Sequence, residues 1–376
     1  MTANDEARGG RKLLFGGVAV LLLLALLEGI GSLAYRFGIS ETERDTIETT
    51  LGMGPGGRND VVRYRPHPYL NYVGNPELTL EDGSRPHHAI GIREPGFDPT
   101  SEAEDAFRIV ALGGSTTYGI FTERADQVWP VLAGMGLSQT LGREIQVVNA
   151  GMANYTSNEI IGMAALWLPE FRPDLVLVHT GLNDAFMAAY PDEGGADARN
   201  FRHAWTHREL PPGVAGILRV SRLARLLGIG WMRNGGYLAG DMTSSIQYPL
   251  PPEQERDRYL SSATGRYYRR NLETIALLVE RTGARPVFVE MPLNPEFESG
   301  ENAYFEAISR AVVRNNGIMR EIAEKRGIPV VSLYEKMRDP AAFRDAAHVN
   351  SLGMAQKAQA VYDSLLPMID GTGRAE

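Results

Sequence analysis

The sequence predicts an α/β fold in which helices cover both faces of a parallel sheet. From residue 107 onward, short apolar runs alternate with longer segments of helical character. Strands that read as continuous apolar runs are typical of parallel sheets, because such strands are buried on both faces. We expect strands at 107–112, 144–149, 174–179, 286–290 and 329–333. We expect helices at 126–141, 157–170, about 253–282, 302–326 and 351–367.

Composition narrows the functional classes. The 376 residues allow one large domain or two, and the formal net charge of −8 argues against a nucleic-acid-binding surface. The chain has no cysteine, which excludes disulfides, thiol catalysis and thiolate metal sites. His87 and His88 have no carboxylate at a matched spacing, so we expect surface histidines and neither a metal nor another cofactor.

A strongly apolar segment at residues 13–35 follows a polar tail, residues 1–12, that carries three basic residues. The segment is about long enough to span a bilayer as one helix, and the basic tail is then expected in the cytoplasm. We therefore expect an uncleaved signal anchor in the inner membrane, with the remainder of the chain periplasmic or otherwise extracytoplasmic. Glu28 interrupts the apolar run and is expected near its outer end. The alternative is a signal peptide cleaved at Ser32-Leu33-Ala34.

Two other parts of the chain have weaker patterns. Residues 36–106 are rich in proline, glycine and charge, and we expect an extended region with two short strands that packs on the main domain. The main domain is expected at 107–370, with an insertion at 185–252. In the insertion, Arg219, Arg222 and Arg225 fall on one face of an expected helix. This helix either packs on the sheet or forms a pocket wall, or it rests on the membrane surface as a basic amphipathic helix.

The stretch Phe107–Gly119, FRIVALGGSTTYG, predicts a buried strand that ends in a glycine turn and presents Ser115. A serine in such a turn is a candidate nucleophile if the chain supplies a base and oxyanion donors. Ligands of open parallel sheets bind beyond the carboxyl ends of the strands. Small or polar residues follow three other predicted strands, at Asn149-Ala150-Gly151, at 179–184 and, after a short loop, at 344–348.

These strand ends carry the remaining parts of a serine hydrolase site. Asp345 and His348 are three residues apart, so their side chains can lie on one side, with the carboxylate holding the imidazole that faces Ser115. The amides of Ser115 and Gly151 and the side chain of Asn183 are candidate oxyanion donors. Each residue also has a structural alternative, such as a helix cap for Asp345 and Asn183 and a simple turn for Gly151.

The chain resembles a membrane-anchored bacterial envelope member of the SGNH (GDSL-like) hydrolase superfamily over about residues 107–368. The matching motifs are Gly113-Gly114-Ser115-Thr116-Thr117, Gly151, Gly181-Leu182-Asn183-Asp184 and Asp345-Ala346-Ala347-His348. The resemblance implies a flavodoxin-like three-layer α/β/α fold with a five-stranded parallel sheet. It also implies Ser115 as nucleophile, His348 as base and Asp345 as its orienter, with oxyanion donors at Ser115, Gly151 and Asn183. Gly114 departs from the family motif, which has Asp there, and the 185–252 segment has no clear family counterpart.

The function expected from this set is a serine esterase that cleaves an O-acyl ester on a carbohydrate or lipid. One alternative is an O-acyltransferase that passes the same acyl group to an envelope or exported polysaccharide. Another is a non-catalytic glycan-binding or assembly protein with a retired site. The substrate, the acyl length and the oligomeric state have no signal in the sequence.

Overall fold

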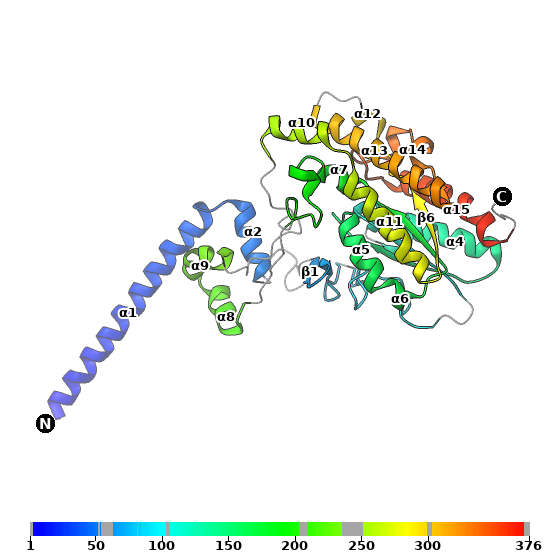
Figure 1. Ribbon diagram of the computed structural model, residues 1–376. Coiled ribbons are helices and arrows are strands. Elements are labelled where there is room, and N and C mark those ends of the chain that lie inside the picture. Colours follow the sequence, from blue (N-terminus) through cyan, green and yellow to red (C-terminus); the bar gives the residue numbers. More distant parts are fainter. Residues whose placement is uncertain are drawn as a thin grey trace. The chain divides into compact units, whose positions relative to one another are not determined.

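The structure is a computed structural model that describes residues 3–51, 53, 63–80, 82–102, 106–122, 124–202, 210–234, 251–298 and 303–371. It divides into two compact units (Figure 1). The smaller unit comprises Met1–Val62 and Thr206–Asp241, and the larger comprises Arg63–Trp205 and Met242–Glu376.

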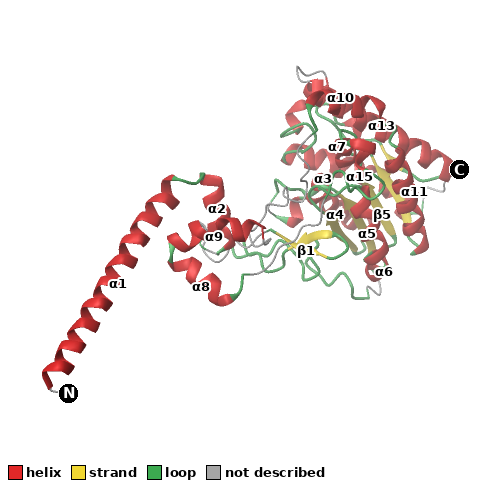
Figure 2. Cartoon of the chain, turned by 60° about the vertical axis from the view of Figure 1, so that its left-hand side comes forward, coloured by secondary structure: helices red, strands yellow, loops and turns green. Residues whose placement is uncertain are grey.

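The larger unit is built on a five-stranded parallel sheet with the strand order β4-β3-β5-β6-β7. Figure 2 shows strands of this unit in yellow among the red helices. The strands are β3 (Phe107–Gly113), β4 (Ile145–Gly151), β5 (Leu175–His179), β6 (Arg285–Val289) and β7 (Val330–Val331). The predicted fold class is confirmed. The expected strand 329–333 is shorter than predicted, because Leu333 already begins the short helix α14 (Leu333–Lys336).

Helices cover both faces of this sheet. On one face, α4 (Trp129–Leu141) and α15 (Ser351–Ile369) pack on each other, and Trp129, Leu137 and Val361 are buried between them and the strands. The second layer consists of α5 (Ser157–Leu166), α11 (Arg266–Arg281) and α13 (Ala303–Arg326). Shorter elements complete the unit, namely α3 (Ser115–Tyr118), α6 (Leu168–Phe171), α7 (Leu182–Met187), α10 (Glu253–Ser262), α12 (Pro295–Glu298) and the 3-10 turns Ala125–Gln127, Pro191–Gly194 and Pro340–Ala342.

Two expected helices are interrupted in the structure. The helix expected at 253–282 breaks between α10 and α11, where Gly265 has a φ of 75° and the Glu193 carboxylate accepts the Thr264 and Gly265 N–H groups at 2.8 and 2.9 Å. The helix expected at 157–170 ends as α5 before Trp167, and α6 restarts with Pro169 in its first turn. In both places a local backbone feature overrides the helical pattern.

The region before the sheet has more structure than its composition indicates. Strands β1 (Tyr64–His67) and β2 (Asn71–Gly74) form an antiparallel pair, which confirms the two short strands expected there. Helix α2 (Glu41–Thr50) was not predicted, because Ile47 is its one large apolar residue. That residue is buried in the smaller unit, so tertiary packing rather than an apolar stripe stabilises the helix.

The smaller unit is helical where the structure describes it. Helix α1 (Ala3–Phe37), α2, α8 (Pro212–Val220) and α9 (Arg222–Asn234) surround a core of Tyr35, Ile47, Leu51, Leu218 and Met232. By length and composition, the segment Phe15–Phe37 of α1 is one candidate membrane span, and only 6% of its most apolar window is buried. The expectation that the helical insertion packs on the sheet is wrong, since α9 packs on α1.

Candidate active site

The structure brings together the three residues of the predicted relay. Strand β3 ends at Gly113, and Ser115 is the first residue of α3. The Ser115 Oγ lies 2.7 Å from His348 Nε2, and His348 Nδ1 lies 2.8 Å from Asp345 Oδ2. Both hydrogen bonds have the lengths of a nucleophile–base–orienter arrangement.

Asp345 both orients the imidazole and holds the loop that carries it. Its Oδ1 accepts hydrogen bonds from the N–H groups of Ala347 at 3.0 Å and His348 at 2.8 Å, so Oδ2 is directed at the ring. Partial burial alone would raise the pKa of Asp345, but the hydrogen bonds from the His348 ring and these N–H groups outweigh it and lower the pKa to about 2. Asp345 is not the cap of α15, because Asn350 fills that role through the Gly353 N–H.

The turn before the nucleophile contains two closely packed glycines. A Cβ at Gly113 would lie 2.1 Å from Thr117 Oγ1, and one at Gly114 would lie 2.9 Å from Asn183 Nδ2. Gly114, where the family motif has Asp, therefore leaves room for the Asn183 side chain. The Ser115 N–H opens α3 and has no acceptor within the described part of the chain, which suits it to an oxyanion.

Gly151 does not fit the oxyanion role expected for it. Its N–H donates to Asn149 Oδ1 at 2.9 Å, and a Cβ there would lie 2.4 Å from the Tyr118 backbone nitrogen. The reason is that β4 continues two residues beyond the predicted end at 149, so that Gly151 is a buried strand residue paired with Gly113. Its glycine identity serves close packing against α3 rather than access to substrate.

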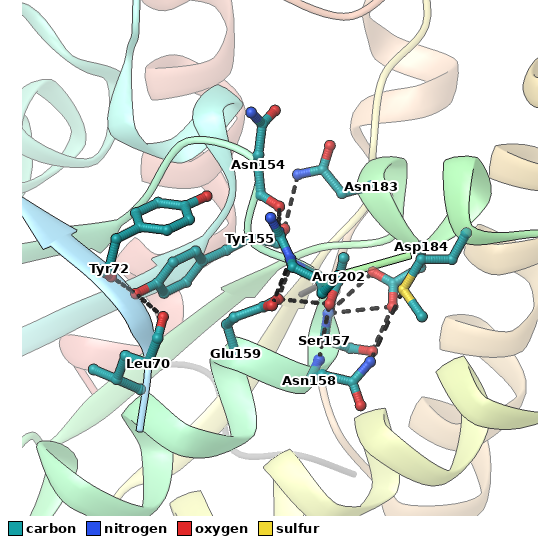
Figure 3. A network of polar contacts seen from close by, with 12 residues as sticks. Leu70, Tyr72, Asn154, Tyr155, Ser157, Asn158, Glu159, Asn183, Asp184 and Arg202 are labelled. Carbon is teal, nitrogen blue, oxygen red and sulfur yellow. Dashed lines mark hydrogen bonds and ion pairs between the residues drawn. The ribbon is translucent and has the colours of Figure 1, made fainter. Parts of the chain in front are cut away.

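Asn154, which the sequence pattern did not single out, is a better candidate. It has a φ of 58°, and its N–H has no acceptor among the described residues. Its carbonyl oxygen accepts a hydrogen bond from Arg202 Nη2, which fixes the orientation of the peptide. Asn183 Nδ2 donates to the carbonyl oxygen of Tyr155, the next residue along the chain, at 2.8 Å (Figure 3). An amide nitrogen carries two protons, so one donor of Asn183 remains. The one sequence feature that points to position 154 is that asparagine adopts positive φ more readily than most residues. Asparagines in many other turns share this property.

A buried polar network supports this loop from below (Figure 3). Asp184 accepts hydrogen bonds from the Ser157 N–H and hydroxyl and, at 3.3 Å, from the Thr180 hydroxyl. Burial raises the pKa of Asp184 to about 6 despite these donors. Glu159 accepts the Thr156 N–H at 2.8 Å and pairs with Arg202 Nε at 2.7 Å. The network ties the 154–157 loop to α7, the helix that carries Asn183.

A second histidine lies in the core near the same turn. His179 Nε2 is 2.9 Å from Lys357 Nζ, and His179 Nδ1 is 3.1 Å from the Val289 carbonyl oxygen. Both side chains are fully buried, and burial lowers the pKa of Lys357 to about 7 and holds that of His179 well below its usual value. Trp129 packs against both and donates its indole N–H to the Thr116 carbonyl at 3.0 Å. His179 is therefore a core residue.

The exposed side of the relay is aromatic and basic. The Phe121 ring is 47% exposed and its centroid lies 5.4 Å from that of the His348 ring, while the Arg344 guanidinium lies 5.3 Å from the Phe121 centroid. Among the described residues, no group of three or more histidine, aspartate or glutamate side chains is placed to hold a metal ion.

Comparison with known proteins identifies the family. A model of the GDSL-like lipase/acylhydrolase family matches residues 111–356, which is more than half of the chain. No curated protein sequence matches. Among solved structures, TesA is 16% identical with a TM-score of 0.40, over 69% of this chain and 99% of its own. An acetylxylan esterase from Geobacillus stearothermophilus, Axe2, is 15% identical with a TM-score of 0.42, over 71% of this chain and 96% of its own.

A GDSL-like lipase from Bacteroides thetaiotaomicron is 14% identical with a TM-score of 0.38, over 71% of this chain and 89% of its own. At these TM-scores the likenesses carry no information on the substrate. The family model covers the end of β3 and all of β4, β5, β6 and β7, together with Ser115, Asp345 and His348. The chain belongs to the GDSL-like lipase/acylhydrolase family.

Proposed function

We propose that this protein is a serine esterase that cleaves an O-acyl ester on a carbohydrate or lipid. The observation that carries the proposal is the pair of consecutive hydrogen bonds, 2.7 and 2.8 Å long, that joins Ser115, His348 and Asp345. A non-catalytic binding or assembly protein has less support, because a retired site would be expected to lack one member of this relay, and all three are present and in contact.

In the acylation step, His348 Nε2 takes the proton of the Ser115 hydroxyl as Oγ attacks the ester carbonyl carbon. The Asp345 carboxylate, with its pKa near 2, is ionised at neutral pH and stabilises the imidazolium that forms. The N–H groups of Ser115 and Asn154 and the free amide proton of Asn183 are the donors we assign to the oxyanion. His348 then gives its proton to the departing alcohol oxygen as the C–O bond breaks.

Water completes the reaction by attacking the acyl-enzyme, again with His348 as the base, and the acid leaves as Ser115 regains its proton. An O-acyltransferase would differ only in this second step, where a sugar hydroxyl replaces water. Incubation of the enzyme with an acyl donor and candidate glycans separates the two reactions: acylated glycan indicates transfer, and exclusive release of free acid indicates hydrolysis.

We also propose that α1 is an uncleaved signal anchor, with residues 1–12 in the cytoplasm and the hydrolase domain, about residues 107–370, in the periplasm. Support comes from packing on both sides of the candidate cleavage site at 32–34. Glu28 binds the start of α9, and Tyr35 is buried in the same helical core. Cleavage would remove the first of these contacts. Mass spectrometry of the membrane-bound protein tests this, since an intact chain is expected and a chain starting at residue 35 would contradict it.

A fluorophosphonate probe tests the esterase directly, because it reacts only with an activated serine. We expect labelling of the wild-type protein and of Ser138→Ala, a surface control, and none of Ser115→Ala. Equal labelling of Ser115→Ala would overturn the proposal. A panel of acetylated sugars and short acyl esters, with Ser115→Ala as the blank, then defines the substrate class.

A further inference from the structure

The turn between α8 and α9 is bound to the apolar part of α1. The Glu28 carboxylate accepts hydrogen bonds from the Ser221 hydroxyl and the Arg222 N–H, both at 2.6 Å. These donors lie at the amino end of α9, where the helix dipole favours a negative charge. A Cβ on Gly31 would lie 2.6 Å from the Leu223 Cβ, so the two helices touch one turn further along α1.

These contacts lie too early in α1 to be outside a bilayer. The uncharged run from Leu13 to Leu27 has 15 residues, which span about 22 Å as a helix, whereas the hydrocarbon core is about 30 Å thick. When α1 crosses the membrane, Glu28 and Gly31 therefore lie within the outer part of the hydrocarbon. The α8–α9 turn must lie at the same depth, because it is bound to both.

The surface of this helix pair suits that environment. Its exposed apolar side chains are Ile217 (60% exposed), Val220 (82%), Leu227 (75%) and Trp231 (47%). Such a run of exposed apolar residues next to an apolar helix is typical of a lipid-contacting surface.

The three arginines of this helix pair do not all lie on one exposed face, as the sequence allowed. Arg225 is buried, and its guanidinium donates to the carbonyl oxygens of Leu218 and Arg219, both at 2.6 Å. Arg219 Nε donates to the Leu51 carbonyl at 2.9 Å. Arg225 and the Nε group of Arg219 thus hold the helical unit together, whereas Arg219 and Arg222 remain exposed beside the apolar side chains of the turn.

We propose that α8 and α9 form a second membrane-contacting element, a helical hairpin whose turn at Val220–Arg222 enters the outer leaflet beside α1. This rests on the signal anchor proposed above. The hairpin supplies the polar partners of Glu28, an acidic residue that would otherwise be left unpaired in hydrocarbon. Its exposed apolar side chains contact lipid acyl chains, and the occupant of this surface is the bilayer itself.

The absence of native cysteine makes the inference testable by single-cysteine labelling of the full chain. Val220→Cys and Leu227→Cys report on the hairpin, Leu22→Cys reports on the middle of α1, and Asn234→Cys is the control at the far end of α9. Each variant is labelled with bimane and reconstituted in vesicles of phosphatidylcholine and phosphatidylglycerol. Fluorescence is then quenched either with acyl-chain spin-labelled lipid or with aqueous iodide.

We expect positions 220 and 227 to lose most of their fluorescence to the lipid quencher and little to iodide, with the reverse at 234. Quenching at 220 and 227 by iodide, with lipid quenching at 22, would overturn the hairpin proposal and leave the anchor intact. Protection at 220 from both quenchers would also overturn it, since another protein surface would then cover the hairpin. A lack of lipid quenching at 22 would overturn the anchor and the hairpin together.

Discussion

Two histidines lie close to the nucleophile turn, and their surroundings give them opposite properties. His348 is partly exposed and paired with a carboxylate, and its other nitrogen contacts Ser115. His179 is fully buried and contacts a lysine and a carbonyl oxygen. Trp129 connects the two regions, because it packs on His179 and donates to the Thr116 carbonyl.

The difference between the relay and the buried pair shows what makes a histidine useful as a base. In the mechanism proposed above, the nearby carboxylate stabilises the imidazolium, so that the ring can accept and return a proton. Burial disfavours the charged forms of both His179 and Lys357. Among the described residues, no carboxylate contacts either ring nitrogen of His179. The buried pair is suited to fixing the position of Trp129, and the relay to moving protons.

The largest effect is expected from removal of the base. His348→Ala should lower kcat by about 10⁶-fold, as loss of the histidine does in other serine hydrolases, and should leave the melting temperature nearly unchanged. Steady-state hydrolysis of a short-chain ester measures this, with His88→Ala as a control outside the relay. Activity within tenfold of wild type would show that another group acts as the base.

Asp345→Asn should have the next largest effect, about 10⁴-fold on kcat, because an amide cannot stabilise the imidazolium. The asparagine oxygen can still accept the Ala347 and His348 N–H groups, so the loop should keep its position. Thermal unfolding of the variant checks that point. A variant with wild-type kcat would mean that Asp345 only shapes the loop.

Loss of a single oxyanion donor should cost less. Asn183→Ala should lower kcat by about 10²–10³-fold with little change in KM, because the lost hydrogen bond forms chiefly in the transition state. The result is read from full kinetic curves, with Asn158→Ala in the neighbouring helix as the control. A rise in KM at constant kcat would instead assign Asn183 to ground-state binding.

Substitutions at two backbone positions decide between Asn154 and Gly151. Asn154→Gly should retain activity, since glycine adopts positive φ without strain, whereas Asn154→Val should lower kcat. Gly151→Ala should lower the melting temperature, because its Cβ would meet the Tyr118 backbone. Wild-type kcat in Asn154→Val would remove Asn154 from the oxyanion site.

The relay was predictable from the sequence because its signals are local. A glycine turn after an apolar strand presents Ser115, and a three-residue spacing places Asp345 beside His348. The oxyanion donor that we propose at Asn154 was not predictable, since it depends on where β4 ends and on the φ of Asn154. The contact between His179 and Lys357 was also not predictable, because Lys357 lies 178 residues later in an apolar helix. Helix α2 depends on burial of a single isoleucine, which no periodic pattern reports.

The smallest effect on activity is expected at the buried pair, where the informative measurement is stability against pH. In the unfolded chain the Lys357 amine titrates near pH 10.4, whereas burial lowers its pKa to about 7 in the folded protein. Between these values the unfolded chain binds more protons than the folded one. The free energy of unfolding should therefore rise with pH above 7, by up to about 1.4 kcal/mol per pH unit from this group.

Lys357→Met should remove that rise and leave kcat within a few-fold of wild type, because Ser115, His348 and Asp345 keep their contacts. Urea unfolding at pH 7 and pH 9 measures the difference, with Lys336→Met as the exposed control. The methionine also leaves His179 Nε2 without its partner, so a uniform loss of about 1–3 kcal/mol at both pH values is expected in addition. The test of a neutral, buried Lys357 is the change in how steeply the free energy of unfolding rises with pH. The uniform loss of stability does not test it. An unchanged slope would mean that Lys357 remains charged in the core, and the contrast between the two histidines would then rest on geometry alone.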